Sequence, residues 1–275
     1  MAPVDTAPLF APLLAELLAL LRGLTPGDWH RSTVAGRWRV RDIAAHLLDG
    51  DLRKIAVYRD QHLLVPEEPI DSPQALAIFI NGINASGVRY AERLSPALLT
   101  DLLAVTGGWV ADLVMACPPH GRSVFPVSWA GETESENWMD IGREYTERWH
   151  HQMQIRDAVG APLLLQPRWL TPLIDIAARA WPPAYAGLPA PPGAAVQVEV
   201  RGETDTDWAL VSGEGAWHGY RGRLAEAACT VRMSADTAWR LLFNALTPDE
   251  MQRRCTISGD AVLAAPLLRA RAVIV

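Results

Sequence analysis

Two segments of the chain carry the residue types from which a metal site can be built. Glu147 and His151 lie four residues apart in one segment, and His46 lies in the other. In an α-helix, residues four apart are one turn apart and about 40° from alignment, so Glu147 and His151 would share a face. With His46 from a second helix they would supply two histidines and one carboxylate, which leaves a coordination position open for water or substrate.

The same spacing has an ordinary explanation. A chain with 31 acidic residues and 7 histidines is expected to place an acid four residues before a histidine by chance, and Asp42 and His46 form a second such pair. Glu147 and His151 would then be a solvated surface pair worth about 0.2–0.5 kcal/mol, and His46 a hydrogen-bonded histidine of a helical core. The spacing alone leaves both interpretations open.

Other candidate side chains give weaker indications. The three cysteines form no C-x-x-C pair, and we expect Cys117 and Cys229 to be inert buried thiols rather than nucleophiles; the third is Cys255. Four histidines are expected at the surface: His30, His62, His120 and His218. Four arginines could bind an anionic substrate, although solvated positions are expected for them: Arg148, Arg156, Arg232 and Arg240. Five tryptophans could line a pocket or fill a helical core: Trp29, Trp38, Trp129, Trp138 and Trp149.

Composition excludes several classes of protein. The chain has 275 residues, of which 49% are hydrophobic, so it is a folded protein of one or two domains. Its net charge of −6 provides no positive field for nucleic acid. The apolar stretch 8–21 contains Glu16 and is too short for a membrane span, and it lacks the flanks of a signal peptide. We therefore expect a cytoplasmic protein that binds neither nucleic acid nor membranes.

Hydrophobic periodicity predicts helices over the first part of the chain. Their approximate ranges are 9–24, 40–60, 72–94, 95–117 and 134–159, of which the third begins with a Ser-Pro pair typical of a helix start and the last ends at Gly160. The two candidate metal-binding segments therefore lie on the second and fifth of these helices.

The character of the sequence changes after residue 165. A short helix over 166–180 precedes a proline-rich stretch at 181–193, which we interpret as a linker or extended surface connection. Alternating apolar residues then predict antiparallel strands near 196–200, 208–210 and 229–233. A helix capped by Ser234, a last helix after Asp260 and a terminal strand at 271–275 complete the prediction. The expected domains are a helical domain over 1–165 and a smaller α+β domain over 166–275.

The two helical segments also resemble a known family. Residues 38–47, WRVRDIAAHL, resemble the second-helix motif of the DinB-like four-helix bundles, in the branch of mycothiol-dependent maleylpyruvate isomerase. Residues 143–158 are similar to the last bundle helix of that branch, and residues 230–275 to its sterol-carrier-like C-terminal domain. The resemblance implies a DinB-like bundle followed by a sterol-carrier-like α+β domain.

The resemblance also implies a ligand set. In this family a divalent metal, usually zinc, is held by a histidine of the second helix and a Glu-x-x-x-His pair of the last, which correspond here to His46, Glu147 and His151. His150 matches no ligand position, although it too lies one turn from Glu147, so the choice between the adjacent histidines rests on the resemblance. Many relatives continue with His-x-x-Asp, whereas Gln154 stands at that place here, which leaves catalytic identity with the isomerase open.

The implied function is that of a thiol-dependent enzyme. A metal-bound low-molecular-weight thiol, mycothiol or bacillithiol, would lose its proton and attack a small electrophile. Addition to a maleylpyruvate-like cis-enedioic acid, rotation and elimination would give the trans isomer, and attack on another electrophile would give S-transfer. A thiol-independent metallohydrolase and a non-enzymatic ligand-binding protein with a structural metal remain alternatives. The sequence specifies neither the substrate nor the oligomeric state.

Overall fold

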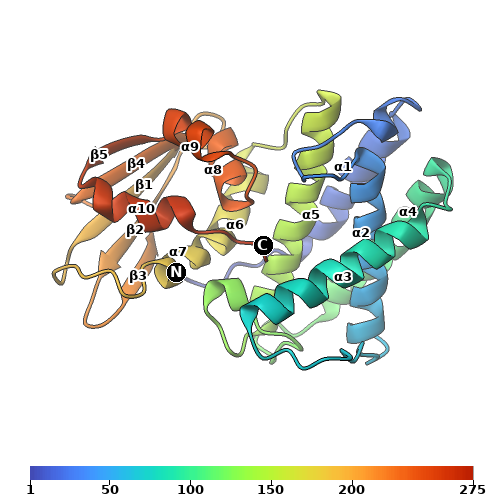
Figure 1. The fold of residues 1–275 in the computed structure, drawn as a ribbon, viewed down its shortest axis with the longest axis horizontal. Helices are drawn as coiled ribbons and strands as arrows, with labels where there is room; N and C mark the ends of the chain where they lie inside the picture. The colour runs from blue at the N-terminus through green and yellow to red at the C-terminus, as the bar shows by residue number, and fades with distance from the viewer. Residues whose placement is uncertain (275) are drawn as a thin grey trace. The chain divides into compact units, whose positions relative to one another are not determined.

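The chain, described for residues 1–274 by a computed structural model, is divided into two compact units (Figure 1). The bundle unit comprises Thr6–Val124 and Glu147–Leu163, and the sheet unit comprises Met1–Asp5, Phe125–Thr146 and Leu164–Ile274. The predicted fold class, a helical bundle followed by an α+β part, is confirmed. The single division predicted after residue 165 stays a prediction.

Helices α1 to α4 and the C-terminal part of α5 form the bundle unit. Their bounds are α1 (Phe10–Arg22), α2 (Val40–Tyr58), α3 (Pro73–Ala91), α4 (Pro96–Ala116) and α5 (Asn137–Val159), with short 3-10 helices η1 (Ala7–Leu9) and η2 (Asp28–His30). The hydroxyls of Ser72 and Ser95 cap α3 and α4 by accepting backbone N–H groups three residues on. Gly160 follows α5 with a φ of 70°, a left-handed conformation that favours glycine. These helices agree with the predicted ones to within a few residues.

The bundle core lies where α2 meets its neighbours. Helix α2 packs against α3 and α4, and α1 packs against α4. Buried residues of α2, α4 and α5 belong to one apolar cluster that includes Ile43, Leu47, Leu103 and Ile155. This shared core fixes α2 beside the C-terminal part of α5, the two segments that carry the candidate ligands.

Within residues 1–274, α4 is the helix that is long and apolar enough to cross a membrane by length and composition. One face of it, with Leu99, Leu103, Val110 and Val114, is buried. The core helix of a soluble protein can have this same composition, although Leu98, Val105, Trp109 and Met115 of α4 are exposed.

The sheet unit contains five strands in the order β3-β2-β1-β4-β5. Their bounds are β1 (Ala195–Arg201), β2 (Thr206–Ser212), β3 (Trp217–Arg221), β4 (Cys229–Ser234) and β5 (Thr256–Gly259). The three predicted strands are present, but their predicted antiparallel arrangement is wrong for one pair, because β1 and β4 are parallel. Period-two alternation reports which face is buried and carries no information on the direction of a neighbouring strand.

The helices of the sheet unit cover this sheet. They are α6 (Pro167–Ala177), α7 (Trp181–Ala184), α8 (Ala235–Leu242), α9 (Pro248–Arg254) and α10 (Ala261–Arg269), with 3-10 helices η3 (Ser128–Ala130) and η4 (Ala178–Ala180). Helix α8 packs against β1 and β4, and α10 packs against β4. Ser234 and Asp260 cap α8 and α10 as the sequence predicts.

Two predictions for this unit need correction. The proline-rich stretch 181–193 begins with helix α7 and lies inside the sheet unit, where Trp181 and Tyr185 are buried, so it does not link the two units. No strand is present at 271–274; the backbone N–H of Ala272 instead donates to Leu242 O at 2.9 Å. The last residue of the predicted terminal strand, at position 275, lies outside the described residues.

Candidate metal centre

Helices α2 and α5 bring the three predicted ligands together. His46, Glu147 and His151 each place a ligand atom within 4.8 Å of the others. His151 Nε2 lies 3.5 Å from Glu147 Oε2, and the ring centroids of His46 and His151 are 4.6 Å apart. All three belong to the bundle unit, so the arrangement rests on the packing of one compact body.

Local sequence explains why these side chains converge. On α2, His46 lies between the buried residues Ile43 and Leu47 and is itself half-buried. On α5, Trp149 and Met153 are completely buried and hold the helix against its neighbours. Glu147 and His151 lie one turn apart on an adjoining face, which places both toward His46.

Burial sets the charge state of the first ligand. The pKa of His46 is well below 6.5, chiefly because burial penalises the charged imidazolium and also because His151 lies beside it. The Glu147 carboxylate opposes this shift without cancelling it. His46 is therefore a neutral imidazole at pH 7, which is the form that binds a metal. Its Nδ1 atom is buried and has no hydrogen-bond partner among residues 1–274.

Two neighbouring residues complete the surroundings of the ligands. Nδ1 of His151 lies 2.8 Å from Oε1 of Gln154, which is one turn further along α5. The indole ring of Trp38 lies 4.8 Å from the His46 ring and 6.2 Å from the His151 ring, centroid to centroid. The sequence singled out Trp38 only as one of several pocket candidates and Gln154 only as a departure from the family pattern. The three-residue spacing of Gln154 after His151 is the signal that could have indicated their contact.

His150 occupies a different position from its neighbour. It is buried, and its ring centroid lies 4.0 Å from that of His151, but it is not one of the three clustered residues. Consecutive helical residues differ by about 100° in direction, so adjacent histidines cannot present their rings in the same way. The geometry therefore separates the two histidines that spacing alone left equivalent.

Comparison with known proteins assigns the chain to a family. Residues 10–156, more than half of the chain, match the family described as the mycothiol maleylpyruvate isomerase N-terminal domain. The chain belongs to this family. The matched range contains His46, Glu147 and His151, and hence the whole candidate centre. No curated protein sequence matches the chain.

Solved structures extend the likeness to both units. The crystal structure of the mycothiol-dependent maleylpyruvate isomerase is 13% identical with a TM-score of 0.54, and a mutant of that enzyme is 11% identical with a TM-score of 0.53. In both comparisons, 92% of each chain is covered, so the fold is the same throughout. A sterol carrier protein 2-like protein from Aedes aegypti is 22% identical over 37% of this chain and 95% of its own, with a TM-score of 0.29.

The other candidates from the sequence mostly have partners within the chain. The four arginines each face a carboxylate of the chain: Arg148 with Asp51, Arg156 with Glu16, Arg232 with Glu199 and Arg240 with Asp236. The solvated position expected for each is wrong for three of them, because Arg156 and Arg240 are buried and the Arg148 side chain is only 13% exposed, whereas Arg232 is exposed. Trp29 and Trp149 are buried, and Trp129 and Trp138 pack in the core of the sheet unit. The four histidines outside the two ligand segments are exposed, as predicted.

Two of the three cysteines are buried thiols with raised pKa values. Cys229 is buried, as predicted, and burial raises the pKa of its thiol. Cys255 is also buried, and burial raises its pKa to about 11. Both thiols are therefore protonated at neutral pH. The predicted burial of Cys117 is only partial, since it lies at the C-terminal end of α4.

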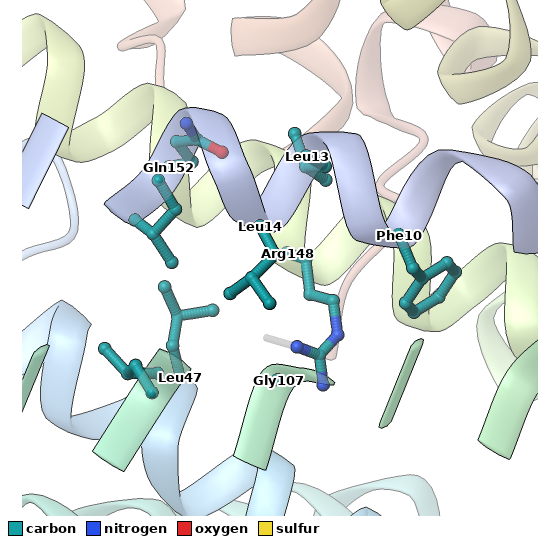
Figure 2. Close-up of a pocket in the computed structure, with 9 residues that line it drawn as sticks. Phe10, Leu13, Leu14, Leu47, Gly107, Arg148 and Gln152 are labelled. Atoms are coloured by element: carbon teal, nitrogen blue, oxygen red, sulfur yellow. The ribbon is translucent and has the colours of Figure 1, made fainter. Parts of the chain in front are cut away.

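The bundle also encloses a small cavity beside the centre (Figure 2). It lies between α1, α2, α4 and α5 and is lined mainly by leucines, with Arg148 and Gln152 as its polar residues. Its volume of about 10 Å³ is close to the space that one water molecule needs. The cavity is therefore too small for an organic substrate.

Proposed function

We propose that the protein is a metal-dependent enzyme that uses a low-molecular-weight thiol as its nucleophile. The observation that carries this proposal is the convergence of His46, Glu147 and His151 inside the family-matched range. The reaction we propose is isomerisation of a maleylpyruvate-like cis-enedioic acid, with S-transfer to a small electrophile as a further outcome of the same chemistry. The thiol is mycothiol or bacillithiol.

The residues present fit a divalent metal. Two imidazoles and one carboxylate are the donor set of catalytic zinc sites, which keep one position open. The buried Nδ1 of His46, which has no protein partner, fits a site completed by a group from outside the chain. When bound, a divalent ion, zinc by preference, would hold a thiol sulfur in its deprotonated form.

The chain's own residues prepare this chemistry. Burial keeps His46 neutral, so its ring can donate a lone pair rather than repel a cation. Glu147 supplies one negative charge, which balances part of the charge of a divalent ion. The Trp38 ring lies beside both histidine rings.

The state of the cysteines supports an external thiol. The buried thiols of Cys229 and Cys255 have raised pKa values, and a protonated thiol is a poor nucleophile. Within the described residues, the cluster of His46, Glu147 and His151 includes none of the three cysteines. Thiol chemistry at this centre therefore calls for a sulfur supplied by a second small molecule.

Metal analysis combined with thiol-dependent turnover tests the proposal. We expect about one divalent ion per chain in the wild type and a large loss of metal in His151→Ala. Mycothiol or bacillithiol should raise the melting temperature of the metal-loaded protein, and glutathione serves as the comparison thiol. Isomerisation of maleylpyruvate should require the thiol. Absence of bound metal would overturn the proposal, and hydrolytic turnover without any thiol would favour a metallohydrolase instead.

A further inference from the structure

We propose that Gln154 is a positioning residue that fixes the ring orientation and tautomer of His151. This inference rests on the metal-dependent function proposed above. In the arrangement we infer, His151 Nδ1–H donates a hydrogen bond to Gln154 Oε1. The lone pair of the ring then resides on Nε2, which faces Glu147.

The contact has the geometry of a strong neutral hydrogen bond. The distance from Nδ1 to Oε1 is 2.8 Å, and both residues are buried, with relative exposures of 7% for His151 and 5% for Gln154. Solvent therefore competes little for either group. Both side chains project from the same helix at positions three apart, so their separation is fixed by the backbone of α5.

The opposite side of the imidazole supports this assignment. A neutral imidazole carries one N–H and one lone pair, so the partner of one nitrogen decides the role of the other. If Nε2 carried the proton, it would donate to Glu147 Oε2, but the 3.5 Å between these atoms exceeds the 2.7–3.2 Å typical of an N–H···O bond. The proton of the His151 ring is therefore on Nδ1, the nitrogen that makes the shorter contact.

An amide in this role also sets the charge of the centre. A divalent ion with two neutral histidines and the Glu147 carboxylate would carry a net charge of +1. Gln154 adds no charge, whereas a carboxylate at this position would cancel the remaining one. The uncancelled charge favours binding of an anion such as a thiolate. A neutral amide partner also predicts weaker metal binding than a carboxylate partner would give, because a negatively charged partner makes the imidazole a stronger metal ligand.

The tautomer can be tested in the metal-free protein. Two-bond ¹H–¹⁵N correlation spectra of histidine-labelled protein distinguish the Nδ1–H form from the Nε2–H form. We expect His151 to be the Nδ1–H tautomer in the wild type and in Gln154→Glu, and a mixture of tautomers in Gln154→Leu. Gln152→Leu is the matched control, because Gln152 is also buried on the same helix but, among the described residues, its amide forms no hydrogen bond. Circular dichroism establishes that each variant is folded.

Metal affinity gives the second readout. Competition with a chelator for Zn²⁺ should show affinity about 10–100-fold weaker in Gln154→Leu. Affinity should be unchanged in Gln152→Leu and equal to or tighter than wild type in Gln154→Glu. Wild-type tautomer and affinity in Gln154→Leu would overturn the role of Gln154 and leave the proposed function standing. If the wild type binds no Zn²⁺, the proposed function fails, while the spectra of the metal-free protein still decide the tautomer.

Discussion

Asp51 on α2 and Arg148 on α5 form a buried ion pair in the bundle unit, with Arg148 Nη2 2.6 Å from Asp51 Oδ1. The Asp51 side chain is completely buried, and that of Arg148 is 13% exposed. The Thr106 hydroxyl donates to the other carboxylate oxygen of Asp51 at 2.6 Å. The pair joins the helix that carries His46 to the helix that carries Glu147 and His151, and Arg148 directly follows Glu147 in the sequence.

Removing one member of this pair should destabilise the bundle. Asp51→Ala removes the buried carboxylate that pairs with Arg148 and accepts from Thr106, and we expect a loss of about 3–5 kcal/mol in the free energy of unfolding. Urea denaturation measures this quantity. Asp101→Asn on α4 is the control, because Asp101 is exposed and a change within about 0.5 kcal/mol is expected there. A loss below about 1 kcal/mol for Asp51→Ala would contradict the prediction.

Replacement of the adjacent histidines His150 and His151 of α5 should have different effects on the stabilisation of the protein by metal. Binding to the folded state alone raises the free energy of unfolding by about 2.7 kcal/mol at a free ion concentration of 100 times Kd. We expect Zn²⁺ to raise the melting temperature of the wild type and of His150→Ala, and to have no such effect on His151→Ala. Each variant is compared with and without Zn²⁺, so a change in its intrinsic stability does not affect the result. The ligand assignment is wrong if His150→Ala alone loses the shift.

Much of this centre could be predicted from the sequence, because the spacing of residues along a helix determines the direction in which their side chains point. The four-residue step from Glu147 to His151 places both on one face whatever the rest of the fold. The choice between His150 and His151 required the resemblance and then the geometry, since both are within a turn of Glu147. The contact of Trp38 with the ligands depends on how the segment before α2 approaches the helix, and no local pattern encodes that approach.

Several features of the sheet unit were not predicted from the sequence. Strands β1, β2 and β4 follow from alternation, but the parallel pairing of β1 with β4 depends on the path of the intervening chain. Strands β3 and β5 were missed; β5 is exposed along its whole length, so it has no buried face to produce a pattern. Helix α9 was missed although Thr247 and Glu250 form a capping box that is visible in the sequence.

Glu199 should make the stability of the sheet unit depend on pH in the acid range. Hydrogen bonding to Arg232 is the main cause that lowers the pKa of Glu199 below 4.5, and Arg201 and Arg223 add to it. Because the folded state holds the carboxylate ionised more strongly than the unfolded state, its contribution is present above pH 4.5 and lost as the pH falls through the lowered pKa. We expect Glu199→Gln to be less stable than wild type at pH 7.

The comparison across pH isolates this effect from other titrating groups. Urea denaturation of wild type and Glu199→Gln at a series of pH values should show a difference that shrinks as the pH decreases below 4.5. Glu226→Gln is a control, because Glu226 is exposed. A difference that is constant across this range would mean that the charge of Glu199 contributes nothing.

Gln152 gives a test of the cavity in the bundle unit. Its side chain is buried and lines this cavity, and neither amide atom has a hydrogen-bond partner in the part of the chain that the structure describes. Since burying an unsatisfied polar group costs about 1–3 kcal/mol, Gln152→Leu should be at least as stable as wild type in thermal denaturation. A marked loss of stability in Gln152→Leu would indicate that a water in the cavity satisfies the amide.

Trp38 should report metal binding through its fluorescence. Its ring lies 4.8 Å from the His46 ring, so a paramagnetic ion such as Co²⁺ at the ligands would quench its emission by short-range energy or electron transfer. The protein has 11 tryptophans, so we expect a partial decrease in total emission that saturates at one Co²⁺ per chain. Trp38→Phe should lose most of this decrease while chelator competition shows that it still binds Co²⁺. Zn²⁺, whose filled d shell gives no such quenching, is the control ion for both proteins. If Co²⁺ reduces the emission of Trp38→Phe as much as that of the wild type, the bound ion lies closer to another tryptophan and away from the cluster of His46, Glu147 and His151.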